Sequence, residues 1–160
     1  VTHVTTGKIV DKGITDANNM GAAMAPAAYD TIQIHLQETG RTPDFYDCIV
    51  TGDLGQLGQE IVREFFRKDG IELGQRYADC GVRLFDPNAQ DVHAGASGCG
   101  CSAIVLAGYL LQQMAAKKYR HILFCGTGAL HSPLSMMQGE SIPGICHAVA
   151  ISRRKEQEHE

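Results

Sequence analysis

Residues 91–102 read DVHAGASGCGCS, and residues 103–119 continue as AIVLAGYLLQQMAAKKY. The first segment combines a histidine and two thiols with the smallest side chains. The second is apolar almost all round in its first half. A turn of small residues followed by such a run predicts a tight turn that opens a buried helix. We expect this helix to lie at the centre of the domain.

The segments before and after this helix alternate between strand and helix patterns. Asp16 is the expected cap of the first helix, Gly40 its end, and residues 71–81 and 131–144 are expected loops. Strands are predicted within 1–10, 45–51, 82–87, 119–129 and 145–154, and helices within 14–40, 57–70 and 101–119. This order predicts an α/β domain with a five-stranded mixed sheet, whose last two strands form an antiparallel hairpin, layered with helices around one central buried helix.

Composition excludes several classes of protein. The chain has 160 residues, 44% of them hydrophobic and 20% charged, which is enough for one domain with a real core. The formal net charge is -4, and a run of three cationic residues occurs only at 153–155, so we expect no nucleic-acid partner. No apolar run approaches the length of a membrane span, and residues 1–10 lack the layout of a signal peptide.

Six cysteines are spread along the chain, at positions 48, 80, 99, 101, 125 and 146. Several of them stand in apolar runs, which favours free buried thiols in a reducing compartment over a disulfide framework. No set of four ligands shows the spacing of a zinc site. We therefore expect neither a bound metal nor a cofactor.

The turn at 93–98 is the first candidate binding site. A helix start leaves backbone N–H groups without partners and carries a partial positive charge, which suits a carboxylate. Gly95 allows close approach of a ligand, Ser97 offers a hydroxyl, Cys99 lies in the same turn, and His93 could present a donor or a cation. The alternative for each is structural, because small residues also permit tight packing, and a lone histidine is commonly a hydrogen-bonded packing group.

Asp53 and Gln56 form a second candidate pair, in the turn after the strand at 45–51. Ligand sites of open α/β sheets lie at the carboxyl ends of strands. Asp53 could orient a histidine or bind a cation, and Gln56 could donate its amide to a carboxylate. The structural alternative for Asp53 is a turn or helix cap, and that for Gln56 is a surface residue in the first helical turn.

Three stretches make the chain similar to one half of the thiolase fold, namely MGAAMAPAAYDTI at 20–32, DCIVTGDLGQLGQEI at 47–61 and VHAGASGCGCSA at 92–103. The resemblance implies a C-terminal thiolase-like domain over 1–154, a solvated tail at 155–160, and an N-terminal half absent from this chain. It also implies a homodimer in the full-length protein.

The amino-acid sequence is more specifically similar to the stage V sporulation protein AD family. GAAMAPAA, VTGDLG, HAGASGCGCSA and the segment 122–151 resemble that family in order. The resemblance implies a protein of the developing spore, peripheral to the inner spore membrane, that binds dipicolinic acid (pyridine-2,6-dicarboxylic acid) and supports its uptake. Membrane proteins of the same sporulation operon are the implied partners. Calcium that accompanies dipicolinate could reach the site, with Asp53 as a ligand.

The chain departs from condensing enzymes of the ketoacyl synthase III type at their catalytic positions. Their histidine position falls on Gly52, and their asparagine position falls near Ala94 or Gly95. Their nucleophilic cysteine belongs to the other half of the fold. We therefore expect a binding protein without catalysis. A cysteine-dependent acyl-transfer enzyme is the alternative, and a scaffold with a vestigial pocket is a third interpretation.

Overall fold

The structure is a computed structural model, which describes residues 1–86 and 88–153. The predicted tail at 155–160 and Pro87, the last residue of the strand predicted at 82–87, lie outside the described residues.

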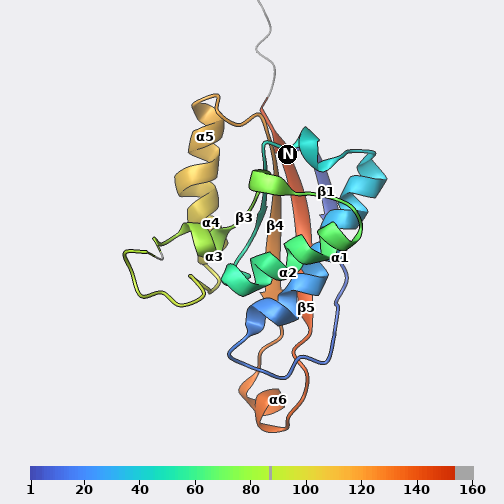
Figure 1. The fold of residues 1–160 in the computed structure, drawn as a ribbon, viewed down its shortest axis with the longest axis vertical. Coiled ribbons are helices and arrows are strands. Elements are labelled where there is room, and N and C mark those ends of the chain that lie inside the picture. Colours follow the sequence, from blue (N-terminus) through green and yellow to red (C-terminus); the bar gives the residue numbers. More distant parts are fainter. Residues whose placement is uncertain (87, 154–160) are drawn as a thin grey trace, which may run out of the picture.

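A single five-stranded mixed sheet organises the molecule (Figure 1). Its strands are β1 (His3–Thr6), β2 (Cys48–Thr51), β3 (Tyr77–Asp79), β4 (His121–Ala129) and β5 (Gly144–Ser152), in the order β1-β5-β4-β2-β3. β2 runs parallel to β3 and β4, whereas β5 is antiparallel to β1 and β4. The predicted mixed sheet and its closing hairpin are confirmed.

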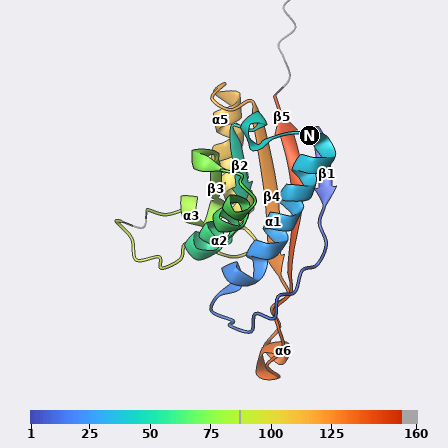
Figure 2. The same ribbon diagram turned by 45° about the vertical axis from the view of Figure 1, so that its right-hand side comes forward.

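Helices α1 (Met20–Thr39) and α2 (Gly55–Lys68) cover one face of this sheet. Because side chains alternate along a strand, Ile49 and Leu123 point to this face, while Val50 and Ile122 point to the other. The second face is covered over β2 and β3 by α3 (Cys80–Arg83) and the central helix, so α1 and α2 stand in front of the sheet in Figure 2 and α5 stands behind it.

The central helix consists of α4 (Cys101–Val105), the π-helical turn η3 (Leu106–Leu110) and α5 (Leu111–Ala115). Cys101, Val105, Leu110 and Met114 face the sheet and are buried. Ile104 is 59% exposed on the other side, and Tyr109 and Leu111 are exposed as well. The prediction of a helix buried all round is therefore wrong for this side, because no described residue covers it.

Two predicted boundaries are also wrong. The cap of α1 is Asn19, whose Oδ1 accepts the Ala22 N–H, while Asp16 closes a turn before it. The third strand is β3, within the expected loop at 71–81, and not the segment 82–87. The chain bends into α3 directly after Asp79, because that carboxylate accepts the N–H groups of Gly81 and Val82.

Three short elements complete the fold. They are η1 (Pro43–Phe45), η2 (Gly74–Arg76) and α6 (Pro133–Met137). α6 lies within the loop predicted at 131–144 and projects from the β4–β5 hairpin (Figure 1). Ser132 begins it by accepting the Ser135 N–H, and Pro133 occupies the first helical position, where a missing N–H costs nothing. Gly40 ends α1 with a left-handed backbone, as predicted.

Candidate ligand site

The turn between β2 and α2 forms the floor of the site. A Cβ atom at Gly52 would lie 2.5 Å from Thr127 Oγ1 and 3.0 Å from Thr127 N, so the neighbouring strand β4 leaves no room for a side chain. Gly55 has a left-handed backbone (φ 68°), and a Cβ there would lie 2.8 Å from Ala94 O. The position at which condensing enzymes carry histidine is therefore occupied by a residue that close packing requires to be glycine.

Asp79 fixes this turn from below, and sequence reasoning missed it. Its side chain is fully buried, and burial raises its pKa, while its donors oppose that rise. Oδ2 accepts Thr51 Oγ1–H (2.7 Å) and Leu54 N–H (2.9 Å). Oδ1 accepts the N–H groups of Gly55, Gly81 and Val82. One carboxylate thus joins the starts of α2 and α3 to the ends of β2 and β3.

Asp53 and Ser97 meet across the site. Asp53 Oδ2 accepts the Ser97 hydroxyl and the Gly98 N–H, each at 3.0 Å. Its Oδ1 accepts the Thr127 hydroxyl at 3.0 Å, and its own N–H donates to Thr127 Oγ1. In this structure the small-residue turn donates to the carboxylate of Asp53, which is part of the chain itself. Binding of a ligand carboxylate by this turn stays a prediction. Of the two structural alternatives for Asp53, the turn role agrees with these hydrogen bonds, whereas the helix-cap role does not apply, since Asp79 accepts the N–H groups at the α2 start.

Gln56, His93 and Gly95 come together around a pocket of about 190 Å³ between α2 and the segment 92–95. Gln56 N–H donates to Ala94 O at 2.8 Å, which holds that segment against the helix. Gln59 and Glu60 also line this pocket, and Gln59 Oε1 is a buried oxygen without a hydrogen-bond partner. Their spacing from Gln56, three and four residues along a helix, is the signal that could have identified them.

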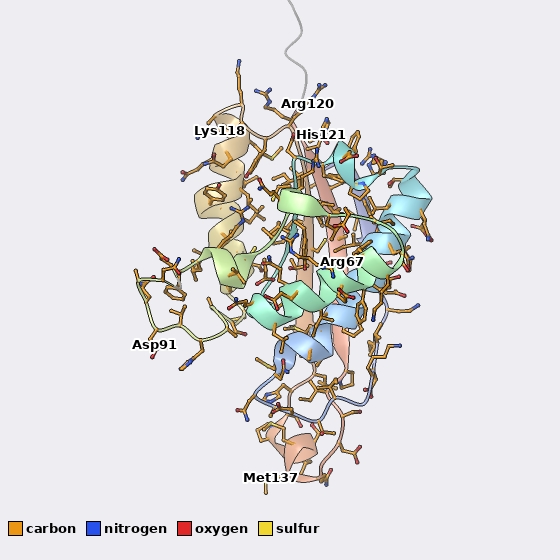
Figure 3. The ribbon with its side chains drawn as sticks, viewed as in Figure 1. Arg67, Asp91, Lys118, Arg120, His121 and Met137 are labelled. Carbon is orange, nitrogen blue, oxygen red and sulfur yellow. The ribbon has the colours of Figure 1, made fainter. Side chains whose placement is uncertain are left out.

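His93 lies at the rim of this pocket. Its backbone is left-handed (φ 47°), a rare conformation outside glycine, and its side chain is 90% exposed. Its Nδ1 is 3.7 Å from Asp91 Oδ1, on the loop that projects from the body of the molecule (Figure 3). The predicted packing role does not apply to this imidazole, which is free to meet a ligand.

Gly95 serves packing as well as access. Its backbone has φ 113°, and a Cβ atom there would lie 2.7 Å from Gly81 O. Ala96 N–H donates to the same oxygen at 2.9 Å. The glycine is therefore required by the approach of α3, which is the structural alternative that its residue type left open.

The thiols are free, as predicted, and five of the six are buried. Burial raises the pKa of Cys48, Cys80 and Cys101. Cys125 also has a raised pKa, first through its hydrogen bond with Cys146 and then through burial. Cys99 is exposed and does not line the pocket. A raised pKa disfavours the thiolate, which is the reactive form in acyl transfer.

No group of three or more His, Cys, Asp or Glu side chains that could hold a metal ion is found among residues 1–86 and 88–153. In the same ranges, no helix is long and apolar enough to cross a bilayer.

The comparisons with known proteins agree with the family that the sequence resembles. The family described as stage V sporulation protein AD matches residues 1–152. Stage V sporulation protein AD of Bacillus subtilis (strain 168) is 44% identical over 153 residues, which cover 96% of this chain and 45% of that protein. The chain thus spans less than half the length of this relative.

Among solved structures, the chain is similar to 3-oxoacyl-[acyl-carrier-protein] synthase III from Aquifex aeolicus VF5. The TM-score is 0.49 at 12% identity, over 96% of this chain and 53% of that one. The sequence match over nearly the whole chain carries the assignment. This chain belongs to the stage V sporulation protein AD family.

Proposed function

We propose that the chain is part of a non-catalytic sporulation protein that binds dipicolinic acid and supports its uptake into the developing spore. The observation that carries the proposal is the pocket between α2 and the segment 92–95, which offers amide and imidazole groups but no hydroxyl or thiol nucleophile among its lining residues. Such a pocket can hold a small polar molecule without forming a bond to it.

The proposed ligand is a flat ring with a nitrogen and two carboxylates. The amides of Gln56 and Gln59 and the imidazole of His93 can donate to carboxylate oxygens. Glu60 lines the same pocket, and its carboxylate repels a dianion. Calcium bound to dipicolinate would offset this repulsion. The Asp53 carboxylate already accepts hydrogen bonds from Ser97, Gly98 and Thr127. We therefore propose that it stabilises the turn and does not contact the ligand.

Acyl transfer is the alternative function. It needs an accessible thiolate, and four of the described thiols have raised pKa values. It also needs groups that stabilise developing charge, and Gly52 has no space for a side chain. These observations favour binding over catalysis for this half of the fold.

The proposed full-length protein contains a second thiolase-like half and forms a homodimer at the inner spore membrane, next to membrane proteins of its operon. The exposed side of the central helix supports the presence of the second half. Ile104, Tyr109 and Leu111 are exposed there, and Ile104 and Tyr109 line a hollow of about 390 Å³ beside Arg83. An apolar surface of this kind is typical of an interface.

Isothermal titration of dipicolinate into the full-length protein tests the proposal, with and without calcium. We expect saturable binding that His93→Ala weakens about tenfold, the loss of one hydrogen bond to a charged group. His131→Ala is the matched control, because His131 is an exposed histidine that does not line the pocket. Unchanged binding in His93→Ala would move the site to the other half, and no binding to the unmodified protein would favour the scaffold interpretation.

A further inference from the structure

Three segments that are far apart in sequence bring cations to one end of the sheet. They are the end of α1 with Arg41, the connection before β4 with Lys117, Lys118 and Arg120, and the end of β5 with Arg153. We call these five residues the basic end. Figure 3 shows Lys118, Arg120 and His121 together at this end of the molecule, opposite the α6 hairpin and its Met137.

Direct contacts join the three segments. Arg153 N–H donates to Arg120 O at 2.9 Å. The Arg41 guanidinium lies 4.2 Å from the centre of the Phe45 ring, and that ring lies 4.4 Å from the imidazole of His121. These contacts bring the three segments together beside Phe45, whose side chain is 36% exposed.

Three of the five cations at the basic end have no carboxylate partner among the described residues. Among the described residues, Arg41, Lys118 and Arg120 form no ion pair with a carboxylate, whereas Lys8 pairs with Asp30 and Arg76 with Asp44. Asp47 is close, but its Oδ2 accepts the backbone N–H groups of Arg120 and His121. The chain as a whole has a formal net charge of -4, whereas this surface is positively charged.

The pKa of His121 is shifted by the same charges. Burial lowers the pKa of this imidazole most, and the charge of Arg120 lowers it further. Arg41 adds to this effect, while Asp47 opposes it. The cations therefore outweigh the nearby acid at the point where the three segments meet.

We propose that the basic end docks on the anionic headgroups of a lipid bilayer. Exposed lysines are hydrated point charges, which suit a fluid layer of phosphates better than one fixed partner geometry. An exposed aromatic ring among cations is typical of side chains at a membrane interface. The surface is less suited to nucleic acid, because the Phe45 ring on which a base would stack is already packed against Arg41 and His121. The inference deepens the proposed membrane location and does not depend on dipicolinate.

Flotation of the full-length protein with vesicles tests the proposal, using phosphatidylcholine with and without phosphatidylglycerol. We expect binding only to the anionic vesicles, and loss of binding between about 0.1 M and about 1 M salt, as the screening length falls. The double variant Lys118→Glu/Arg120→Glu should bind these vesicles at least about thirtyfold more weakly, since two attractive charges are lost and two repulsive ones are added.

The matched control is Lys12→Glu/Lys68→Glu, which changes the net charge equally at two exposed lysines outside the basic end. Equal losses in both double variants would overturn the proposal, because net charge alone would then explain binding. Lys118→Gln/Arg120→Gln repeats the test without charge reversal, and thermal unfolding of each variant checks the fold. If Lys118→Glu/Arg120→Glu still binds the vesicles but is retained more weakly on single-stranded DNA than the unmodified protein, the surface is assigned to nucleic acid instead. Failure of vesicle binding leaves the titration with dipicolinate unaffected, so the two proposals fail separately.

Discussion

His35 is a buried imidazole between two hydroxyl groups. Its Nδ1 lies 2.8 Å from Thr5 Oγ1, and its Nε2 lies 2.6 Å from Tyr46 OH, which also accepts from Arg41. Both ring nitrogens are thus used within a chain of polar groups that links β1, α1 and η1. Burial, and then the charges of Arg41 and His3, lower the pKa of His35 from 6.5 to about 4.

This shift predicts a loss of stability in acid. The folded-state pKa lies below the unfolded one, so the unfolded chain takes up the proton first. Stability is complete above about pH 6.5 and falls as the pH approaches 4, by about 3 kcal/mol in total. Urea unfolding of the chain at several pH values measures this slope. His35→Gln should flatten it and His131→Ala should not, and equal slopes in all three proteins would contradict the prediction.

Residue types predicted the site only in part. Gln56, His93 and Gly95 could be placed at a pocket because turn, strand end and helix start converge in any α/β sheet. The pairing of Asp53 with Ser97 could not, because it depends on how closely the turn approaches β2. Asp79 was missed because an aspartate in an expected loop has no sequence signal for burial.

At the scale of elements, one carboxylate holds two strands and two helices together. Asp79→Asn replaces an oxygen that accepts N–H groups with an amide that donates, so at least two of its five hydrogen bonds are lost inside the core. We expect the free energy of unfolding to fall by about 3 kcal/mol, measured by urea unfolding.

Asp44→Asn is the control for this prediction. Asp44 is exposed and pairs only with Arg76 on the surface, so its loss should cost less than about 1 kcal/mol. Similar losses in the two variants would show that Asp79 is not the junction that its hydrogen bonds indicate.

Long elements were predicted better than short ones. The β4–β5 hairpin has nine residues on each strand, and each strand contains a continuous or nearly continuous apolar run, which is typical of a buried strand. β3 has only three residues and three buried side chains, so no alternation marks it. α6 has five residues and is set by the Ser132 cap and Pro133 rather than by an apolar pattern.

At the scale of the whole molecule, the sheet has one face that helices cover and one that they cover in part. Val4 on β1 stands opposite Val149 on β5, and it is 63% exposed on the partly covered face. Ile104 and Leu111 are exposed on the central helix, which covers β2 and β3 on the same face. The sequence correctly indicates an apolar helix, but its outer side is not buried by the described residues.

The proposed second half gives this surface a measurable role. Ile104→Lys should change the stability of the 160-residue chain by no more than about 0.5 kcal/mol, because the side chain is exposed there. In the full-length protein the same change should cost about 2 kcal/mol or more, since a lysine would enter an apolar interface. Leu57→Lys is the control, since Leu57 is exposed on α2, which covers the opposite face of the sheet. If Ile104→Lys costs equally little in both proteins, the second half does not cover the central helix, and its apolar side must be free for another partner.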